Sequence, residues 1–220
     1  MHGVIFDMDG VLADSNETHF QAFIRMGEEL GVPFPRTMLE RSFGMHNNQI
    51  FPMWLGADLT QPRIDALADR KEALYRELAR DTLQPIAGAV DLFNALHRAG
   101  WRLAVASSGP GANVRLALDV LGLAGRLDAV VTGDDVTYGK PAPDVFLLAL
   151  KGLGLPATRC VVVEDAPNGV EAARAAGIAV VAVTTSKPAH ALSNADLVVE
   201  TLAELGPQVL LDVMQLRRRP

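Results

Sequence analysis

Carboxylate, hydroxyl and ammonium side chains follow short apolar runs of the chain, where they could act together on a phosphate. These candidate side chains are those of Asp7, Asp9, Ser107, Lys140, Glu164 and Asp165. Carboxylates packed side by side repel one another unless a cation neutralises them, so the group predicts a hard, oxygen-binding metal such as Mg²⁺. A divalent cation next to a lysine is in turn a favourable environment for a phosphate group.

The elements that must position these residues alternate along the chain. Apolar, β-branched runs predict buried strands at Val4–Phe6, Leu103–Ala106, Ala129–Val131, Val161–Val163 and Ala179–Val183. From residue 83 on, helical patterns alternate with these runs and end near Gly100, Gly122, Gly152 and Gly177. This alternation predicts an α/β fold in three layers, a parallel sheet covered by helices on both faces. Ligands bind outside the carboxyl ends of such strands, so the candidate residues should meet at one edge.

The alternation breaks over residues 15–82, where the apolar spacing predicts helices and no strand. One helix is expected over about Asn16–Leu30, and another after Pro62. We therefore expect a helical domain of residues 15–82, inserted into a core formed by residues 1–14 and 83–220.

Two polar residues interrupt the apolar faces of these helices. Lys71 lies between Ile64 and Leu74 on the second helix, and His19 borders the stripe that contains Phe23 on the first. Either residue could contact a substrate. Either could instead be structural, as a lysine whose stem packs while its head stays in water, or a histidine with a partner inside the domain.

The composition excludes several classes of protein. With 20 Lys+Arg against 26 Asp+Glu, the net charge is −6, whereas a general nucleic-acid binder needs clustered positive charge. The single cysteine, Cys160, can form neither an internal disulfide nor a cysteine zinc site. No stretch approaches the ~18 uninterrupted apolar residues of a membrane span, and the N-terminal stretch lacks a signal-peptide core. We expect a cytoplasmic monomer or weak homodimer that binds neither nucleic acid nor membranes.

Four motifs then identify a family resemblance. They are DMDGVLADS (7–15), LAVASSG (103–109), GKPAPD (139–144) and VVVEDAPNGVEAARAAG (161–177). Through them the chain resembles the haloacid dehalogenase-like superfamily, in the branch of phosphatases and β-phosphoglucomutases that carry a helical cap after the first strand. The resemblance implies a Rossmann-like core with an inserted helical cap domain, and a small phosphorylated metabolite as substrate.

The resemblance also implies roles for the residues that follow the strands. Asp7 would be the nucleophile that forms an aspartyl-phosphate, and Asp9 would protonate the leaving alkoxide and then activate water. The implied Mg²⁺ ligands are Asp7, the backbone carbonyl of Asp9, and Asp165. Glu164 would contribute directly or through a water molecule. Lys140 would offset charge on the transferring phosphoryl group.

The phosphate-binding residues follow from the same resemblance. Ser107, with the backbone of Ser108 and Gly109, would hold the phosphate oxygens, together with Gly10 beside Asp9. The presence of Asp9 favours phosphoryl transfer over dehalogenation, because a departing halide needs no acid.

In the cap, the resemblance implies that His19 and Lys71 help to gate closure and support the site, and Asn47 is a third candidate substrate-binding residue. Asn47 stands where mutases use an arginine to bind a second phosphate, a task that suits an arginine fork. The sequence therefore favours a Mg²⁺-dependent phosphatase of a small sugar or polyol phosphate, with a β-phosphoglucomutase-type mutase as the alternative. A third hypothesis, a non-enzymatic phosphate sensor, is disfavoured because all the catalytic residue types are present.

Overall fold

The chain folds into two compact units. The computed structural model describes residues 1–42 and 47–217. Met1–Asp14 and Gln84–Pro220 form one unit, which contains the large sheet and is called the sheet unit below. Ser15–Leu83 form the other, called the helical unit.

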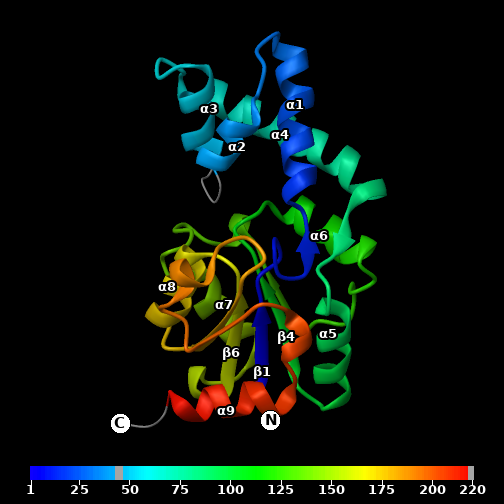
Figure 1. Cartoon of the computed structure of the whole chain (residues 1–220), viewed down its shortest axis with the longest axis vertical. Helices are drawn as coiled ribbons and strands as arrows, with labels where there is room; N and C mark the ends of the chain where they lie inside the picture. Colours follow the sequence, from blue (N-terminus) through cyan, green and yellow to red (C-terminus); the bar gives the residue numbers. More distant parts are fainter. Residues whose placement is uncertain (43–46, 218–220) are drawn as a thin grey trace. The chain divides into compact units, whose positions relative to one another are not determined.

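The large sheet has its parallel strands in the order β5-β4-β1-β6-β7-β8. Figure 1 shows its central strand β1 between β4 and β6. The strands are β1 (Gly3–Phe6), β4 (Arg102–Ala106), β5 (Ala129–Val131), β6 (Cys160–Glu164), β7 (Ala179–Val183) and β8 (Leu197–Val199). A second, antiparallel pair joins β2 (Ala13–Asp14) and β3 (Gln84–Pro85). In the large sheet β1 pairs with β4 and β6, which places Ile5 between Ala104 and Val162. The predicted parallel α/β fold is therefore confirmed.

Helices cover both faces of the large sheet, so every residue of β1, β6 and β7 is buried. Ile5 belongs to a core cluster that contains apolar side chains of α7 and α8. On the opposite face, Phe93 of α5 stacks on Phe6 with a centroid distance of 6.2 Å. The α-helices of the sheet unit are α5 (Ala89–Arg98), α6 (Gly111–Val120), α7 (Asp144–Leu153), α8 (Pro167–Ala175) and α9 (Pro207–Leu216). Its 3-10 helices are η1 (Gly133–Asp135), η2 (Ala157–Arg159), η3 (Ala189–Leu192) and η4 (Leu202–Glu204).

The strand order reverses beside β1. The chain passes outward from β1 through β4 to β5, then returns to β6 on the other side of β1 and continues to β7 and β8. Such a reversal leaves a crevice beyond the carboxyl ends of the two strands that flank it, and ligands of open parallel sheets usually bind there. The ends of β1 and β6 are therefore the place to look for a site.

Two features of the sheet unit add detail to the sequence prediction. The helix expected to end near Gly152 ends at Leu153, one residue past that glycine. Gly154 caps the helix, with a left-handed φ of +61° that suits glycine. Strand β8, which joins the large sheet beside β7, was not predicted from the sequence.

The helical unit consists, within the described residues, of α1 (Asn16–Leu30), α2 (Arg36–Ser42), α3 (Asn47–Leu55) and α4 (Gln61–Thr82). Its core is aromatic: Phe23 stacks on Phe34 at 4.5 Å and meets Trp54 edge-on at 6.1 Å. Helices α1 and α4 match the two predicted helices. Helices α2 and α3 were not predicted, because they are too short to show a clear helical spacing of apolar residues. None of the helices in the two described ranges has the length and apolar character needed to cross a membrane.

Candidate active site

Three carboxylates meet where the strand order reverses. Asp7 directly follows β1, and its N–H donates to the carbonyl of Val163 at 3.0 Å, which continues the pairing with β6. Glu164 is the last residue of β6, and Asp165 follows it. One carboxylate oxygen from each of Asp7, Glu164 and Asp165 lies within 4.8 Å of the others. Sequence reasoning placed these acids at strand ends, and the sheet order brings them together.

Lys140 lies among these acids. Its Nζ donates to Asp7 Oδ1 at 2.6 Å, to Glu164 Oε1 at 2.7 Å and to the carbonyl of Ala106 at 3.2 Å. The lysine is buried, as are both carboxylates. The sequence predicted that this ammonium would reach toward a phosphate; in the structure it bridges the ends of β1, β4 and β6.

The charges of this cluster shift one another's proton affinities. Burial raises the pKa of Asp7 to about 7, with Glu164 and Asp9 adding to the rise and Lys140 opposing it. Burial, Glu164 and Asp7 likewise raise the pKa of Asp165 well above its usual range. Burial alone would lower the pKa of Lys140, but the carboxylates of Asp7 and Glu164 outweigh it and raise that pKa. The ammonium of Lys140 therefore does not offset the effect of burial on the pKa values of Asp7 and Asp165.

The donor set fits a hard divalent cation. Asp7 and Asp165 offer carboxylate oxygens, the ligands that Mg²⁺ prefers, and a cation between them would favour their charged forms against the burial that raises their pKa values. Both oxygens of Glu164 already accept hydrogen bonds. Its Oε1 accepts from Lys140, and its Oε2 accepts from the N–H groups of Asp165 and Ala166 at 2.7 and 2.9 Å.

A serine loop follows β4 beside this cluster. The N–H of Ser107 donates to the carbonyl of Val131 at 3.0 Å, and its buried Oγ accepts from the N–H of Gly109 at 3.0 Å. Ser108 is exposed. A Cβ placed on Gly109 would lie 3.3 Å from Ser107 Oγ and 3.9 Å from Asp9 Oδ2, so the Asp9 carboxylate lies across from this loop. The predicted phosphate-binding residues and the predicted acid therefore lie close together.

Gly10 lets the loop after β1 approach Asp165. Its φ is +76°, and a Cβ at this position would lie 2.0 Å from Asp165 Oδ2 and 2.7 Å from Ser186 Oγ. The Ser186 hydroxyl is hydrogen bonded to the Asp165 carboxylate, and the Thr185 hydroxyl donates to the carbonyl of Gly10 at 2.5 Å. Sequence reasoning missed Thr185 and Ser186. Both follow the predicted strand Ala179–Val183, so the strand-end rule could have found them.

A second polar cluster lies inside the helical unit. Lys71 Nζ lies 2.8 Å from His19 Nδ1 and donates to Glu72 Oε1 at 2.9 Å. Asn47 Nδ2 donates to the same Glu72 oxygen at 2.9 Å. Lys71 and Asn47 therefore meet at Glu72, which sequence reasoning missed, and His19 joins them through Lys71. The signal available was a second charged residue next to Lys71 on a helix with an apolar face.

This helical-unit cluster is buried and internally paired. Lys71 and Glu72 are 4% and 8% exposed, so the interpretation of Lys71 as a packed stem with its head in water is wrong. The imidazole of His19 stacks on Tyr75 at 4.0 Å, and Lys71 Nζ lies 4.9 Å from the centroid of Phe23. Although burial opposes the shift, Lys71 and His19 lower the pKa of Glu72, with help from the Asn47 hydrogen bond. The cluster thus holds a charged pair inside an aromatic core.

Three carboxylates and a lysine lie at the point where the strand order of the parallel sheet reverses. This arrangement defines an α/β enzyme with an acidic site suited to a cation. The chain belongs to the haloacid dehalogenase-like hydrolases, since the family model described as haloacid dehalogenase-like hydrolase matches residues 1–177. The predicted family and the prediction that the chain is a hydrolase of this kind are confirmed.

Individual relatives carry both phosphatase and mutase names. The chain is 31% identical over 220 residues to a phosphorylated carbohydrates phosphatase of Thermotoga maritima, covering 98% of this chain and 99% of that one. It is 32% identical over 219 residues to a β-phosphoglucomutase of Bacillus subtilis, covering 96% of this chain and 94% of that one. Among solved structures, a family IA hydrolase from Entamoeba histolytica is 26% identical, with a TM-score of 0.89 and coverage of 98% and 100%.

Proposed function

We propose that the chain is a Mg²⁺-dependent phosphatase that hydrolyses a small phosphorylated metabolite of the sugar or polyol phosphate type. The observation that carries the proposal is the buried arrangement of Asp7, Lys140 and Glu164, with Asp165 beside it. Attack on a phosphate ester needs a carboxylate held next to positive charge, because the nucleophile and the phosphate otherwise repel each other.

Asp7 acts as the nucleophile. One of its oxygens forms a bond to phosphorus while the P–O bond of the ester breaks, which leaves an aspartyl-phosphate and an alkoxide. Lys140, 2.6 Å from Asp7 Oδ1, orients the carboxylate and offsets negative charge on the transferring group.

Asp9 acts first as acid and then as base. Its carboxyl group gives a proton to the departing alkoxide, and the resulting carboxylate removes a proton from the attacking water. The bond between phosphorus and Asp7 then breaks and inorganic phosphate leaves. The position of Asp9 Oδ2 across from Gly109 supports this role, because it places the acid beside the loop proposed to hold the phosphate.

Mg²⁺ is proposed to bind Asp7, Asp165 and the backbone carbonyl of Asp9. Glu164 acts through water, a choice supported by the three hydrogen bonds that its oxygens already accept. When bound, the cation would act as a Lewis acid that offsets the negative charge of the phosphate oxygens.

The phosphate oxygens are held by the serine loop and the loop after β1. Ser107 offers its hydroxyl, and Ser108 and Gly109 offer backbone groups at the carboxyl end of β4. Gly10 adds the backbone of the loop that carries Asp7 and Asp9. Backbone and hydroxyl groups of this kind bind phosphate without adding charge.

The helical unit is proposed to serve as the cap, residues 15–82, that determines which ester is accepted. His19, Lys71 and Asn47 are the proposed substrate contacts. Their connection through Lys71 and Glu72 supports a common role. A polar cluster buried in an aromatic core is often less stable than apolar packing, so stability alone does not account for it.

Phosphate release from a panel of sugar phosphates, polyol phosphates, phosphoglycolate and bisphosphates tests this function. We expect hydrolysis of one substrate class with Mg²⁺ and none with EDTA. Asp9→Asn should be slower by at least ~100-fold, because general acid-base catalysis is lost. Asp119→Asn, at an exposed position of α6, is the matched control. The proposal is overturned if no ester releases phosphate.

The second candidate function is a sugar phosphomutase, favoured by the relative of that name and by the His19–Lys71 pair. It predicts conversion of β-glucose 1-phosphate to the 6-phosphate with a bisphosphate primer. Asn47 argues against it, because its amide donates to a carboxylate instead of presenting a guanidinium to a second phosphate. Hydrolysis of the ester without this conversion would contradict the phosphomutase function.

A further inference from the structure

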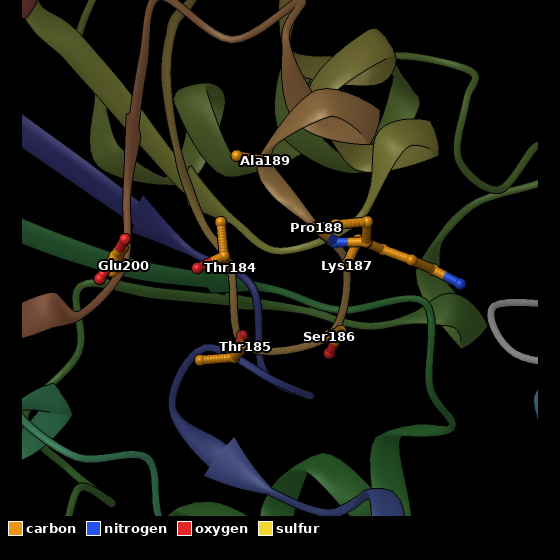
Figure 2. A pocket seen from close by; sticks show the side chains of 7 residues that line it. All are labelled: Thr184, Thr185, Ser186, Lys187, Pro188, Ala189 and Glu200. Carbon is orange, nitrogen blue, oxygen red and sulfur yellow. The ribbon is translucent and has the colours of Figure 1, made fainter.

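The loop after β7 lies next to the carboxylate cluster but has no part in the proposed chemistry. It lines a pocket of about 600 Å³ together with Glu200 (Figure 2). The loop residues in this lining are Thr184, Thr185, Ser186, Lys187, Pro188 and Ala189. Strand β7 is hydrogen bonded to β6, so this loop begins beside Asp165.

Thr185 fixes the backbone of the loop that follows β1. Its hydroxyl donates to the carbonyl of Gly10 at 2.5 Å, a contact between residues 175 positions apart. Gly10 follows Asp9 directly, and Asp9 offers a backbone carbonyl to the proposed metal site. Holding the next carbonyl therefore restricts the direction in which the Asp9 carbonyl points.

Ser186 fixes the orientation of Asp165. Its hydroxyl is hydrogen bonded to the Asp165 carboxylate, and both groups crowd the space beside Gly10, where a Cβ would be 2.0 Å from Asp165 Oδ2 and 2.7 Å from Ser186 Oγ. The residue directly after the two acids, Ala166, has no hydroxyl of its own. The neighbouring loop supplies one instead.

We propose that Ser186 and Thr185 are positioning residues of the metal site: Ser186 orients Asp165, and Thr185 orients the loop that carries Asp7 and Asp9. This inference rests on the proposed function only in that Asp7, Asp165 and the Asp9 carbonyl bind Mg²⁺. Groups that hydrogen-bond a metal ligand fix its direction, and their loss typically weakens metal binding. Neither hydroxyl touches the substrate in this account.

The first test is Mg²⁺ binding measured by calorimetry without substrate. Ser186→Ala should bind Mg²⁺ about 10-fold more weakly than the wild type, and Ser186→Thr, which keeps the hydroxyl, should bind more tightly than the alanine variant. Thr184→Ala is the matched control, because Thr184 lines the same pocket and contacts neither Gly10 nor Asp165 through the bonds described. Thermal unfolding in EDTA checks that each variant is folded.

The second test concerns Thr185. Thr185→Val keeps the shape and removes the donor, whereas Thr185→Ser keeps the donor. We expect about 3- to 10-fold weaker Mg²⁺ binding for the valine variant and rescue by the serine variant. In assays at saturating Mg²⁺, the KM for the ester should stay unchanged, because the substrate contacts remain.

The outcomes separate this inference from the proposed function. If the wild type binds Mg²⁺ but hydrolyses no ester, the phosphatase proposal falls and the positioning proposal is still decided by calorimetry. If Ser186→Ala and Thr185→Val bind Mg²⁺ as tightly as the wild type, the positioning proposal is overturned. If the wild type binds no Mg²⁺, both fall.

Discussion

Lys140 is the residue around which the acids of the sheet unit are arranged. Its ammonium reaches Asp7, Glu164 and the carbonyl of Ala106, and thereby joins three neighbouring strand ends. Removing one partner from a buried group of charges is costly, because the remaining charges are then unpaired in an interior that solvates them poorly.

Lys140→Met should lower the free energy of unfolding by about 3–5 kcal/mol, because two buried carboxylates are left without their cation. Urea unfolding at neutral pH measures the change. Lys151→Met, at an exposed position of α7, is the control and should change stability by less than about 1 kcal/mol. Equal effects for the two variants would contradict the assigned role of Lys140.

Glu72 gives a pH-dependent prediction in the helical unit. Its pKa in the folded chain is lower than its ordinary value of 4.5, even though burial opposes the shift, because Lys71 and His19 favour its charged form. The unfolded chain therefore binds more protons near and below pH 4.5, so this contribution to stability is present above that pH and is lost as the pH falls through the folded pKa.

Glu72→Gln should destabilise the chain by about 3 kcal/mol at pH 7, because Lys71 loses its buried counter-charge. The difference from the wild type should shrink as the pH falls below 4.5. Glu77→Gln is the control on the same helix, since Glu77 pairs with Arg70 at an exposed position. A difference that stays constant from pH 7 to acid would contradict the assigned charge of Glu72.

At the scale of elements, α8 begins against the last residue of β6. A Cβ on Gly169 would lie 1.7 Å from Glu164 Oε1, so the helix can approach this carboxylate only because residue 169 has no side chain. This close approach helps to fix Glu164, which also accepts hydrogen bonds from Lys140 and from the start of the α8 segment.

Gly169→Ala should destabilise the chain by about 1–3 kcal/mol through overpacking, although alanine is the better helix former. Gly206→Ala is the control, because nothing lies within 4 Å of a Cβ at that position and its φ of −165° is extended. The control should cost no more than about 1 kcal/mol. Chemical denaturation compares the two, and a stabilising Gly169→Ala would contradict the close packing.

The sequence predicts the parallel sheet and the residues at its strand ends, because short, continuous apolar runs are typical of buried strands. It cannot predict which charged groups pair across the sheet. Lys140 shows this, since its contacts with Asp7 and Glu164 depend on the spatial order of β1 and β6, which the chain order does not determine uniquely. Glu72 and Ser186 had local signals, beside Lys71 and after the predicted strand Ala179–Val183, but their contacts with Asn47 and Asp165 join residues distant in sequence.

In the whole molecule, catalysis is proposed for the sheet unit and substrate selection for the helical unit. The sheet unit contains the carboxylates, the lysine and the serine loop, whereas the helical unit contains the His19–Lys71–Glu72 cluster. The chain leaves and re-enters the sheet unit at the paired strands β2 and β3, so both connections start from one small antiparallel pair.

Mg²⁺ should stabilise the whole chain, because a ligand that binds only the folded state shifts unfolding by mass action. At ~100 times the dissociation constant the gain is about 2.7 kcal/mol. Asp165→Asn should remove most of this gain, because it loses a charged ligand. Thermal unfolding with Mg²⁺, and with NaCl at equal ionic strength, measures it. Equal stabilisation of wild type and variant would contradict the metal site.

Transfer of the phosphoryl group to Asp7 can be observed by trapping the covalent intermediate. A labelled phosphate ester whose leaving group needs no proton, such as p-nitrophenyl phosphate, is mixed with Asp9→Asn and Mg²⁺ and quenched in acid. The variant lacks the base for the second step, so labelled protein should accumulate, and peptide mapping should place the label on Asp7. Release of phosphate without labelled protein, or a label on another residue, would contradict the account.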